Sequence, residues 1–417
     1  MKILGIVTLL CALDVILAEK VRFDGHKVLD IVPKTANDVH NIANMEEQFQ
    51  LDFWHYPKYI NDSFHVRVSP NDLEPFLSKL REMEATVRVW IDDVQRMVDM
   101  EERRRRERRS TEIDILKTYL TFDQINAYIA GQAAQHSNMK VSYLQNNTYL
   151  GKSIPVVKIT NLVEEANKSI FIDCGIHARE WISPAFCLFV IKKLLSGKRQ
   201  ENALLAMYNW HIVPVLNPDG YVFSHTENRL WRKNRRQNRN NGKCPGVDLN
   251  RNFGYEYNPG VGGSKRHCSQ IYTGANAFSE AESDGLRRYI MDNLDENFLS
   301  YLTIHSYGQM WLYPWGYKAE YPDDVVNLSL AAKYATAALK SVIGTDYVEG
   351  TSTEILYSAA GGSDDWAKGG ANITYSYTLE LRDTGFFGFT LPENQIEDTV
   401  LETWEGVKAL AFFIANE

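Results

Sequence analysis

Ionisable side chains gather directly after an apolar run in residues 170–184, which read IFIDCGIHAREWISP. His177 and Glu180 follow this run, His305 ends the apolar run YLTIH, and Glu380 lies near the end of YSYTLELRD. In open α/β sheets, ligands bind outside the carboxyl ends of the strands, so groups from separate strands can meet there. Two histidines and a glutamate are a known ligand set for catalytic zinc, which keeps a fourth position for water.

A zinc ion in such a site would supply hydrolytic chemistry. It lowers the pKa of bound water to about 7, and a nearby carboxylate such as Glu380 can take the proton. This pattern predicts a peptidase. An isolated His-x-x-Glu also occurs as a structural pair, and the alternative role for Glu380 is an ion pair with its near neighbour Arg382.

The elements around these residues indicate an α/β fold. Strand-length apolar runs (SIFIDCGI, WHIVPVLN, YLTIHSY and YSYTLEL) alternate with helical patterns at 185–197 and 325–343. Strands that are apolar on both faces and interleaved with helices predict a mixed, largely buried central sheet with helices on both faces.

The N-terminal part of the chain has a different pattern. The segments FHVRVSP and TVRVWID alternate as strands do, and SPNDLEPFLSKLREM has a helical period that begins at a cap-like Ser69 or Asn71. Over about ninety residues, this mixture predicts a small α+β domain.

An arginine-rich stretch, MEERRRRERRS, separates the two parts. Like charges repel and resist burial, so we expect an exposed linker or the end of a helix. Residues 106–109 read Arg-Glu-Arg-Arg, a form that proprotein convertases cut, and trypsin-like proteases also cut after arginine. We therefore predict cleavage by an activating protease at Arg109.

Residues 1–18 predict a secretory signal peptide, because Lys2 precedes an apolar stretch that ends at Ala18. No later stretch is long and apolar enough to predict a membrane span. The net charge of -8 argues against surfaces for nucleic acid or anionic membrane, which need a basic excess. We expect a secreted, extracellular protein that is most simply a monomer, with no nucleic-acid or membrane partner.

Five cysteines are present, and Cys11 would leave with the signal peptide. The other four predict two disulfides in an oxidising compartment, although sequence alone permits three connectivities. Local pairing of Cys174 with Cys187 and of Cys244 with Cys268 closes short loops. Glycosylation sequons begin at Asn61, Asn146, Asn167, Asn327 and Asn372.

From about Leu116 to the C-terminus the chain resembles the M14 metallocarboxypeptidases, the pancreatic carboxypeptidase A and B family. The resemblance rests on HAREW, NRLWRKNR, GVDLNRNF, TIHSYGQ, GGSDDW and ELRDTGFFGF, in that order. It implies a zymogen with a signal peptide (1–18), an activation propeptide (19–109) and a zinc carboxypeptidase domain (110–417). The propeptide would be an open sandwich with a connecting helix near 91–106 that keeps substrate out of the cleft.

The resemblance also implies roles for single residues. One Zn²⁺ would be held by His177, Glu180 and His305, with Glu380 as general base and later proton donor. Asp248 would orient His177 through its other ring nitrogen.

Further residues match the family's substrate site. Asn250 and Arg251 would bind the terminal carboxylate of a peptide, and Tyr357 would close over it. Arg232 would polarise the scissile carbonyl. Of the neighbouring arginines, Arg235, Arg236 and Arg239 are interpreted as a solvated basic face, and the role of Arg229 stays open.

Specificity is predicted from Asp364, which stands where the family has the floor of its side-chain pocket. An aspartate there implies a preference for C-terminal Arg or Lys. Asp365 is interpreted as structural. Ser352 stands where the B-type enzymes usually have glycine, and their extra cysteine pair is absent. The alternatives are A-type or broad specificity, or a non-catalytic binding relative.

Overall fold

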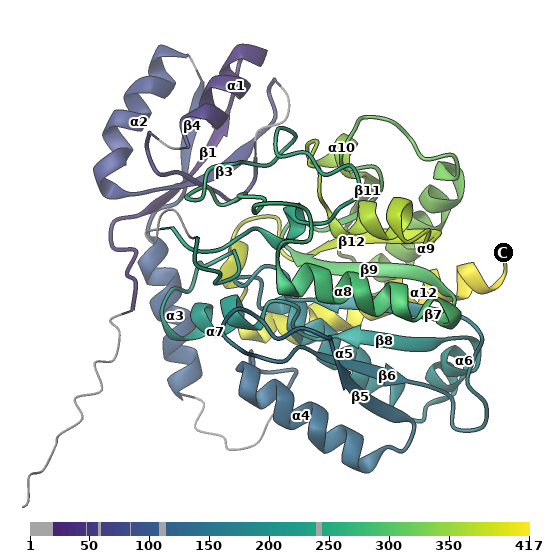
Figure 1. The fold of residues 1–417 in the computed structure, drawn as a ribbon. Helices are drawn as coiled ribbons and strands as arrows, with labels where there is room; N and C mark the ends of the chain where they lie inside the picture. The colour runs from purple at the N-terminus through teal and green to yellow at the C-terminus, as the bar shows by residue number, and fades with distance from the viewer. Residues whose placement is uncertain (1–19, 47, 57–59, 84, 108–113, 239–243) are drawn as a thin grey trace, which may run out of the picture.

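The structure is a computed structural model that describes residues 20–46, 48–56, 60–83, 85–107, 114–238 and 244–417. The predicted signal peptide and the predicted cleavage residue Arg109 lie outside these residues. A small N-terminal unit, purple to slate blue in Figure 1, lies beside a larger unit that contains the rest of the chain.

The N-terminal unit is the predicted α+β open sandwich. Its four strands are antiparallel, in the order β2-β3-β1-β4, and pack with two helices around a core of their own. Ser69, one of the two predicted caps, accepts a hydrogen bond from the backbone nitrogen of Asp72 and so begins α2. The elements are β1 (Lys27–Val32), α1 (Ala36–Asn44), β2 (Asp52–Phe53), β3 (Phe64–Val68), α2 (Pro70–Glu82) and β4 (Thr86–Ile91).

The helix α3 (Val94–Glu107) connects this unit to the larger one, close to the range predicted for the connecting helix. Its arginine-rich end has the exposed and half-buried positions expected of a charged stretch, whereas Val94, Val98 and Glu101 are buried. The helix runs along the flank of the larger unit, beside α7 (Pro218–Thr226) in Figure 1.

The larger unit contains a mixed sheet of eight strands in the order β11-β10-β12-β9-β7-β8-β6-β5. The four central strands run parallel, and β6 and β10 pair with them antiparallel. The predicted apolar runs form β7 (Ser169–Cys174), β8 (Asn209–Val213), β9 (Phe298–Ser306) and β12 (Tyr375–Leu381). The outer strands are β5 (Met139–Tyr143), β6 (Pro155–Ile159), β10 (Met310–Tyr313) and β11 (Val348–Thr351).

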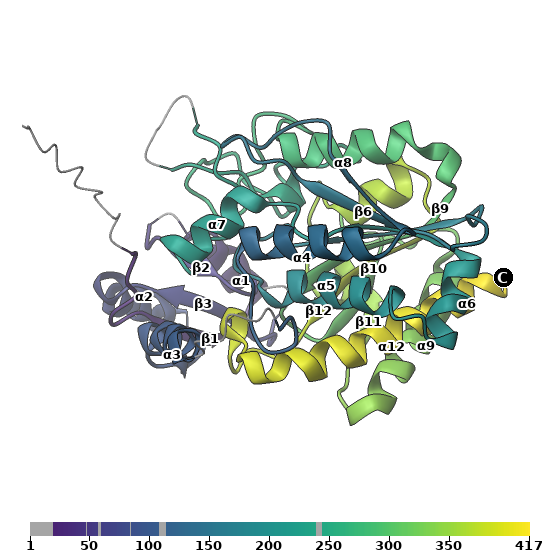
Figure 2. The same ribbon diagram turned by 90° about the horizontal axis from the view of Figure 1, so that it is seen from below.

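Helices cover both faces of this sheet, as predicted. Figure 2 shows α8 on one side and α4, α5 and α12 on the other. The helices of this unit are α4 (Phe122–Gln135), α5 (Ile182–Leu194), α6 (Arg199–Met207), α7, α8 (Ala281–Asp292), α9 (Val325–Ile343), α10 (Ser352–Ile355), α11 (Ser363–Asp365) and α12 (Ile396–Ala415).

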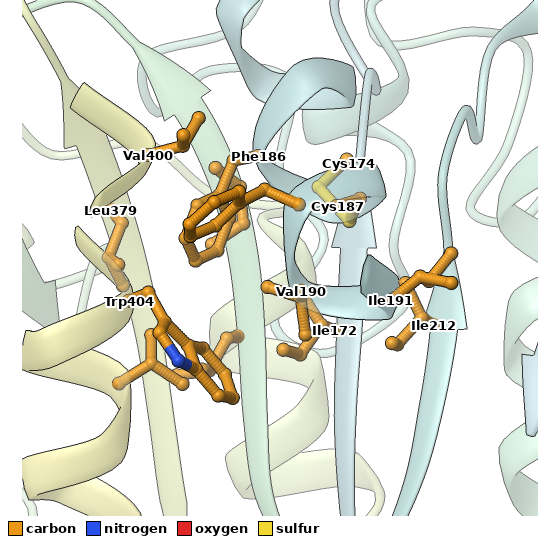
Figure 3. Packing of buried hydrophobic residues seen from close by; sticks show 14 of the residues in the cluster. Ile172, Cys174, Phe186, Cys187, Val190, Ile191, Ile212, Leu379, Val400 and Trp404 are labelled. Carbon is orange, nitrogen blue, oxygen red and sulfur yellow. A yellow bond between two sulfur atoms is a disulfide. The ribbon is translucent and has the colours of Figure 1, made fainter. Parts of the chain in front are cut away.

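Each central strand sends alternate side chains into one of two cores. Ile172 and Leu379 pack toward α5 and α12, where Phe186, Val190 and Trp404 meet them (Figure 3). Full burial of one such side chain stabilises the fold by about 1.5–3 kcal/mol. The opposite positions, such as Phe171 and Tyr301, pack toward α8. This second face leads to the polar residues of the site.

The two disulfides follow the local pairing. Cys174 is joined to Cys187 and Cys244 to Cys268. The first, visible in Figure 3, ties the end of β7 to α5. Among the sequons, Asn61, Asn167, Asn327 and Asn372 are exposed and Asn146 is half-buried. Across the described part of the chain, we find no helix with the length and apolarity needed to cross a bilayer.

Candidate metal centre

The turn between β7 and α5 places His177 and Glu180. Gly175 begins it with a φ of +67°, and a Cβ at this position would meet Pro184 and the backbone of Val215. Glycine is therefore required for so tight an exit from the strand. Ser183 fixes the turn, because it accepts a hydrogen bond from Gly175 nitrogen and donates one to the carbonyl of Ile304.

The register of the parallel strands places His305 and Glu380. These two residues lie opposite each other on β9 and β12, at the carboxyl ends where β7 also ends. Strand pairing therefore brings together the polar residues that end the separate apolar runs, as the sequence predicted.

Three ligand atoms converge at this edge. His177 Nδ1 lies 2.9 Å from Glu180 Oε1, and His305 Nδ1 lies 3.1 Å from both His177 Nδ1 and Glu180 Oε2. All three side chains are buried, and they are the group of ligands in the described residues whose atoms fit one ion. Two imidazole nitrogens and a carboxylate oxygen that converge in this way are ligands that zinc takes, so the donor set fits zinc.

The electrostatics of the cluster also favour a positive charge. Burial opposes ionisation of Glu180, but the two histidines outweigh it and hold the pKa of its carboxyl below the usual range. Burial lowers the pKa of His305, but the neighbouring carboxylate of Glu180 outweighs this effect and raises the pKa of the imidazole to about 9. Both shifts describe a pocket that stabilises a cation beside Glu180.

Glu380 is adjacent to this cluster but outside its ligand set. Burial and the neighbouring Glu180 raise the pKa of its carboxyl above the usual range. The alternative partner Arg382 is engaged elsewhere: its Nε donates to Glu402 at 2.6 Å, and it also donates to Thr345. Glu380 therefore faces the cavity, where it can exchange a proton with a substrate or water.

Asp248 holds the opposite side of His177. Its Oδ1 lies 3.0 Å from His177 Nε2, and its Oδ2 accepts a hydrogen bond of 2.8 Å from Arg232. This contact is compatible with the role predicted for Asp248, in which it would orient a ligating imidazole through the nitrogen that does not face the ligand set. Asp248 also keeps the Arg232 guanidinium at the edge of the cavity.

The predicted carboxylate-binding residues lie together on the cavity wall. Arg251 donates to Tyr357 Oη at 2.7 Å and to the carbonyl of Gly262. Asn250 is held by the backbone nitrogen of Ser363, which donates to its amide oxygen at 2.9 Å. The cavity encloses about 310 Å³ and is lined by all three predicted residues together with the ligand set.

Asp364 lies at the same cavity and is buried, 6% exposed. Burial raises the pKa of its carboxyl, and Thr378 is its side-chain hydrogen-bond partner. Among the ion pairs of the described residues, none involves Asp364. Asp365, by contrast, accepts hydrogen bonds from the backbone nitrogens of Gly316 and Tyr317, which is a structural role.

Residues of the N-terminal unit also line the cavity, which the sequence did not show. Trp54 packs against Phe389 and Tyr307, and Tyr56 packs 5.3 Å from the ring of Tyr357. The aromatic segment FWHY of residues 53–56 was the available signal, since aromatic side chains are enriched at contact surfaces between proteins.

Among the described residues, two ion pairs in which both partners are buried join the units. Arg179 donates to both oxygens of Asp52 at 2.9 and 3.0 Å. Arg229, whose role the sequence left open, binds the carboxylate of Glu101 on α3 and contacts the face of Trp181 at 3.6 Å.

The interpretation of the neighbouring arginines as a solvated face is corrected by their contacts. Arg235 lies 3.6 Å from the ring centroid of Phe223, and Arg236 binds Glu280 and the carbonyl of Ser279. Stems of arginine cover apolar surface, and a buried carboxylate attracts the charge, so composition alone misjudged them. Arg239 lies outside the described residues.

Comparison with known proteins supports this arrangement. A family model described as zinc carboxypeptidase matches residues 125–406, and one described as carboxypeptidase activation peptide matches residues 29–101. The chain is 42% identical to a carboxypeptidase B of Astacus astacus over 300 residues, covering 72% of this chain and 98% of that one. It is 38% identical to carboxypeptidase A1 of Bos taurus over 396 residues, covering 92% and 93%.

A solved structure shares the fold across both units. The carboxypeptidase A from Helicoverpa armigera superposes with a TM-score of 0.87 at 30% identity, covering 94% of this chain and 98% of that one. The zinc carboxypeptidase model and the buried ligand set both indicate one zinc ion. The activation peptide model indicates that the chain includes an activation peptide. The chain belongs to the zinc carboxypeptidase family.

Proposed function

We propose that the chain is the secreted zymogen of a carboxypeptidase that removes C-terminal Arg or Lys from peptides and proteins. The observation that carries the preference is the buried carboxylate of Asp364 at the cavity, without an ion-pair partner among the described residues. A guanidinium or ammonium group offsets the cost of burying this charge, whereas an apolar side chain leaves it unpaired.

The proposed zinc ligands are His177, Glu180 and His305. When bound, zinc polarises the scissile carbonyl and makes water a nucleophile at neutral pH. Glu380 takes a proton from the attacking water and passes it to the leaving amine, because its carboxylate is beside the ligand set and not part of it.

Other side chains orient the substrate and stabilise charge. Arg251 and Asn250 bind the terminal carboxylate, and Tyr357 closes over it from the same wall. Arg232 faces the cavity while Asp248 holds it, so its guanidinium is preorganised for the developing oxyanion.

A profile of substrates that differ only in their last residue tests the specificity. The chain is cleaved with trypsin or a convertase near Arg109, and the hydrolysis of acyl-dipeptides that end in Arg and in Phe is compared. We expect a higher kcat/KM for Arg, and loss of both activities in a chelator. A preference for Phe would favour the A-type alternative, to which the similarity with carboxypeptidase A1 also points.

Secretion is supported by the two disulfides, since such bonds persist in oxidising compartments. Expression of the full chain in cultured eukaryotic cells tests it. We expect protein in the medium whose N-terminus begins at residue 19, whereas retention in the cytosol with residue 1 intact would contradict the proposal.

A further inference from the structure

A carboxylate beneath the site takes no part in the mechanism above. Asp173 lies on β7 and is fully buried, and no ion pair of the described residues involves it. Burial raises the pKa of its carboxyl to about 6. Because a buried carboxylate without a cation is costly, its presence in the core of the sheet calls for a reason.

The register of the strands places Asp173 beside Thr303, which lies two residues before the ligand His305. Asp173 lies opposite Thr303 on β9, and Thr303 lies opposite Thr378 on β12. Side chains two positions apart on a strand share a face, so Thr303 lies directly beneath His305. A polar row therefore runs under the ligands, with Asp173 at one end.

Two hydrogen-bond distances join this row to the imidazole. Thr303 Oγ1 lies 3.0 Å from Asp173 Oδ1 and 3.3 Å from His305 Nε2. The Nδ1 atom of His305 faces the ligand set, so a ligating ring carries its proton on Nε2 and must donate from there.

Among the described residues that hydrogen-bond distances place near Nε2, only Thr303 can accept that proton. The other neighbour is Asn250 Nδ2 at 3.5 Å, and an amide nitrogen donates but does not accept. Thr303 must therefore accept from His305, and its single hydroxyl hydrogen is left to donate to Asp173.

We propose that Asp173 is a positioning residue for the zinc ligand His305: it takes the hydroxyl hydrogen of Thr303 and so directs the Thr303 oxygen at His305 Nε2. Asp248 does the same for His177 by direct contact. Each ligating histidine is thus oriented by its own carboxylate, one directly and one through a threonine. The inference rests on the proposed ligand set.

The test measures zinc affinity of the full-length chain by competition with a chelator of known affinity. Partners that orient a metal ligand typically change metal affinity by about 10–100-fold. We expect Thr303→Val, which keeps the shape of the side chain, to weaken zinc binding about 10-fold. Thr303→Ser keeps the hydroxyl and should restore affinity close to that of the wild type.

The double variant separates a hydrogen-bond chain from two independent effects. Asp173→Leu, whose side chain has a similar size but cannot accept the hydroxyl hydrogen of Thr303, should weaken zinc binding. Asp173→Leu combined with Thr303→Val should bind zinc no more weakly than Thr303→Val alone, because the carboxylate acts only through the hydroxyl. Additive losses would overturn the proposal. If Asp173→Leu does not fold, Thr303→Val decides alone, and wild-type affinity in that variant would overturn it.

Ser300→Ala is the matched control for a lost hydroxyl on the same strand. Ser300 is buried on β9 and donates to the carbonyl of Tyr375, with no contact to the ligands. The Ser300→Ala variant should be less stable but should bind zinc as tightly as the wild type. A loss of zinc affinity equal to that of Thr303→Val would overturn the proposal. His305→Ala checks the ligand set separately: it should bind zinc far more weakly whatever the result for Thr303.

Discussion

At the scale of single residues, the site contains two glutamates, Glu180 and Glu380, in different positions relative to the histidines. Glu180 lies within hydrogen-bonding distance of both histidines, whereas Glu380 lies opposite His305 on the next strand and faces the cavity. Similar side chains therefore receive different roles from their positions. Glu180 completes the ligand set, and Glu380 is the proposed general base.

Glu380→Gln should keep zinc and lose activity. The amide has the same shape but cannot take a proton, and positioned general bases contribute about 10²–10⁴-fold. Zinc content by atomic absorption and kcat of the cleaved enzyme measure the two effects. Activity within a few-fold of the wild type would show that another group is the base.

Asp364→Ile should change the preferred C-terminal residue. Breaking a buried charge pair costs about 3–5 kcal/mol, so the ratio of kcat/KM for Arg over Phe should fall by roughly 100-fold or more. Asp364→Asn, which removes the charge but keeps the size, is the matched variant and should lose the Arg preference without gaining activity on Phe. An unchanged ratio in both would place the specificity charge elsewhere.

At the scale of elements, α3 is held by a cluster that contains the buried imidazole of His225. His225 on α7 stacks on Trp181 at 3.9 Å, and its Nδ1 accepts a hydrogen bond from Arg105 at 3.2 Å. Burial, together with the positive charges of Arg105, Arg229 and Lys20, lowers the pKa of His225 well below its usual value. The nearby acids Glu101 and Glu102 are engaged by Arg229 and by Lys20 and Arg106.

This shift predicts that acid releases α3. Docked α3 adds to the burial of His225 and brings the charge of Arg105, so the pKa of His225 is lower when α3 is docked than when it is not, and protons favour the undocked state. The docking contribution of His225 is therefore present at neutral pH and is lost progressively as the pH falls.

The rate at which activity appears after cleavage measures this release. Samples are incubated at pH 7.5 and at pH 5.5 and assayed at one fixed pH. We expect faster release at pH 5.5, and less difference between the two pH values in His225→Gln. The exposed His40 on α1 provides the control, since His40→Gln should retain the full pH dependence.

At the scale of the whole molecule, the N-terminal unit forms part of the wall of the cavity that contains the ligand set. Trp54 and Tyr56 occupy its wall, while the buried pairs Asp52–Arg179 and Glu101–Arg229 fasten the units at two places. The uncleaved chain should therefore bind zinc fully and exclude peptides.

Removal of the Trp54 side chain should weaken this exclusion. Tryptophans at interfaces often contribute about 2 kcal/mol, so uncleaved Trp54→Ala, which loses a half-buried ring, should show up to about 30-fold more residual activity than the uncleaved wild type. Arg81→Ala on the exposed face of α2 is the control and should stay inactive. Equal activity in the Trp54 variant and the wild type would mean that the exclusion depends on other contacts.

The sequence by itself determined the layered fold, the types of residue at the metal centre and the division into a small and a large unit. Apolar runs set the strands, and the polar residues at their ends predicted a common edge because parallel strands finish on the same side. The outer strands β5, β6, β10 and β11 were not predicted, since they are short and lie at or near the edges of the sheet.

Only the tertiary structure decided which residues support these ligands. Asp173 and Thr303 are far apart in the chain, and their contact depends on the register of β7 against β9. The partner of Arg229 and the packing of Trp54 depend on how two separately folded units meet. Contacts of this kind are fixed by packing between surfaces, and no local pattern of residues encodes them.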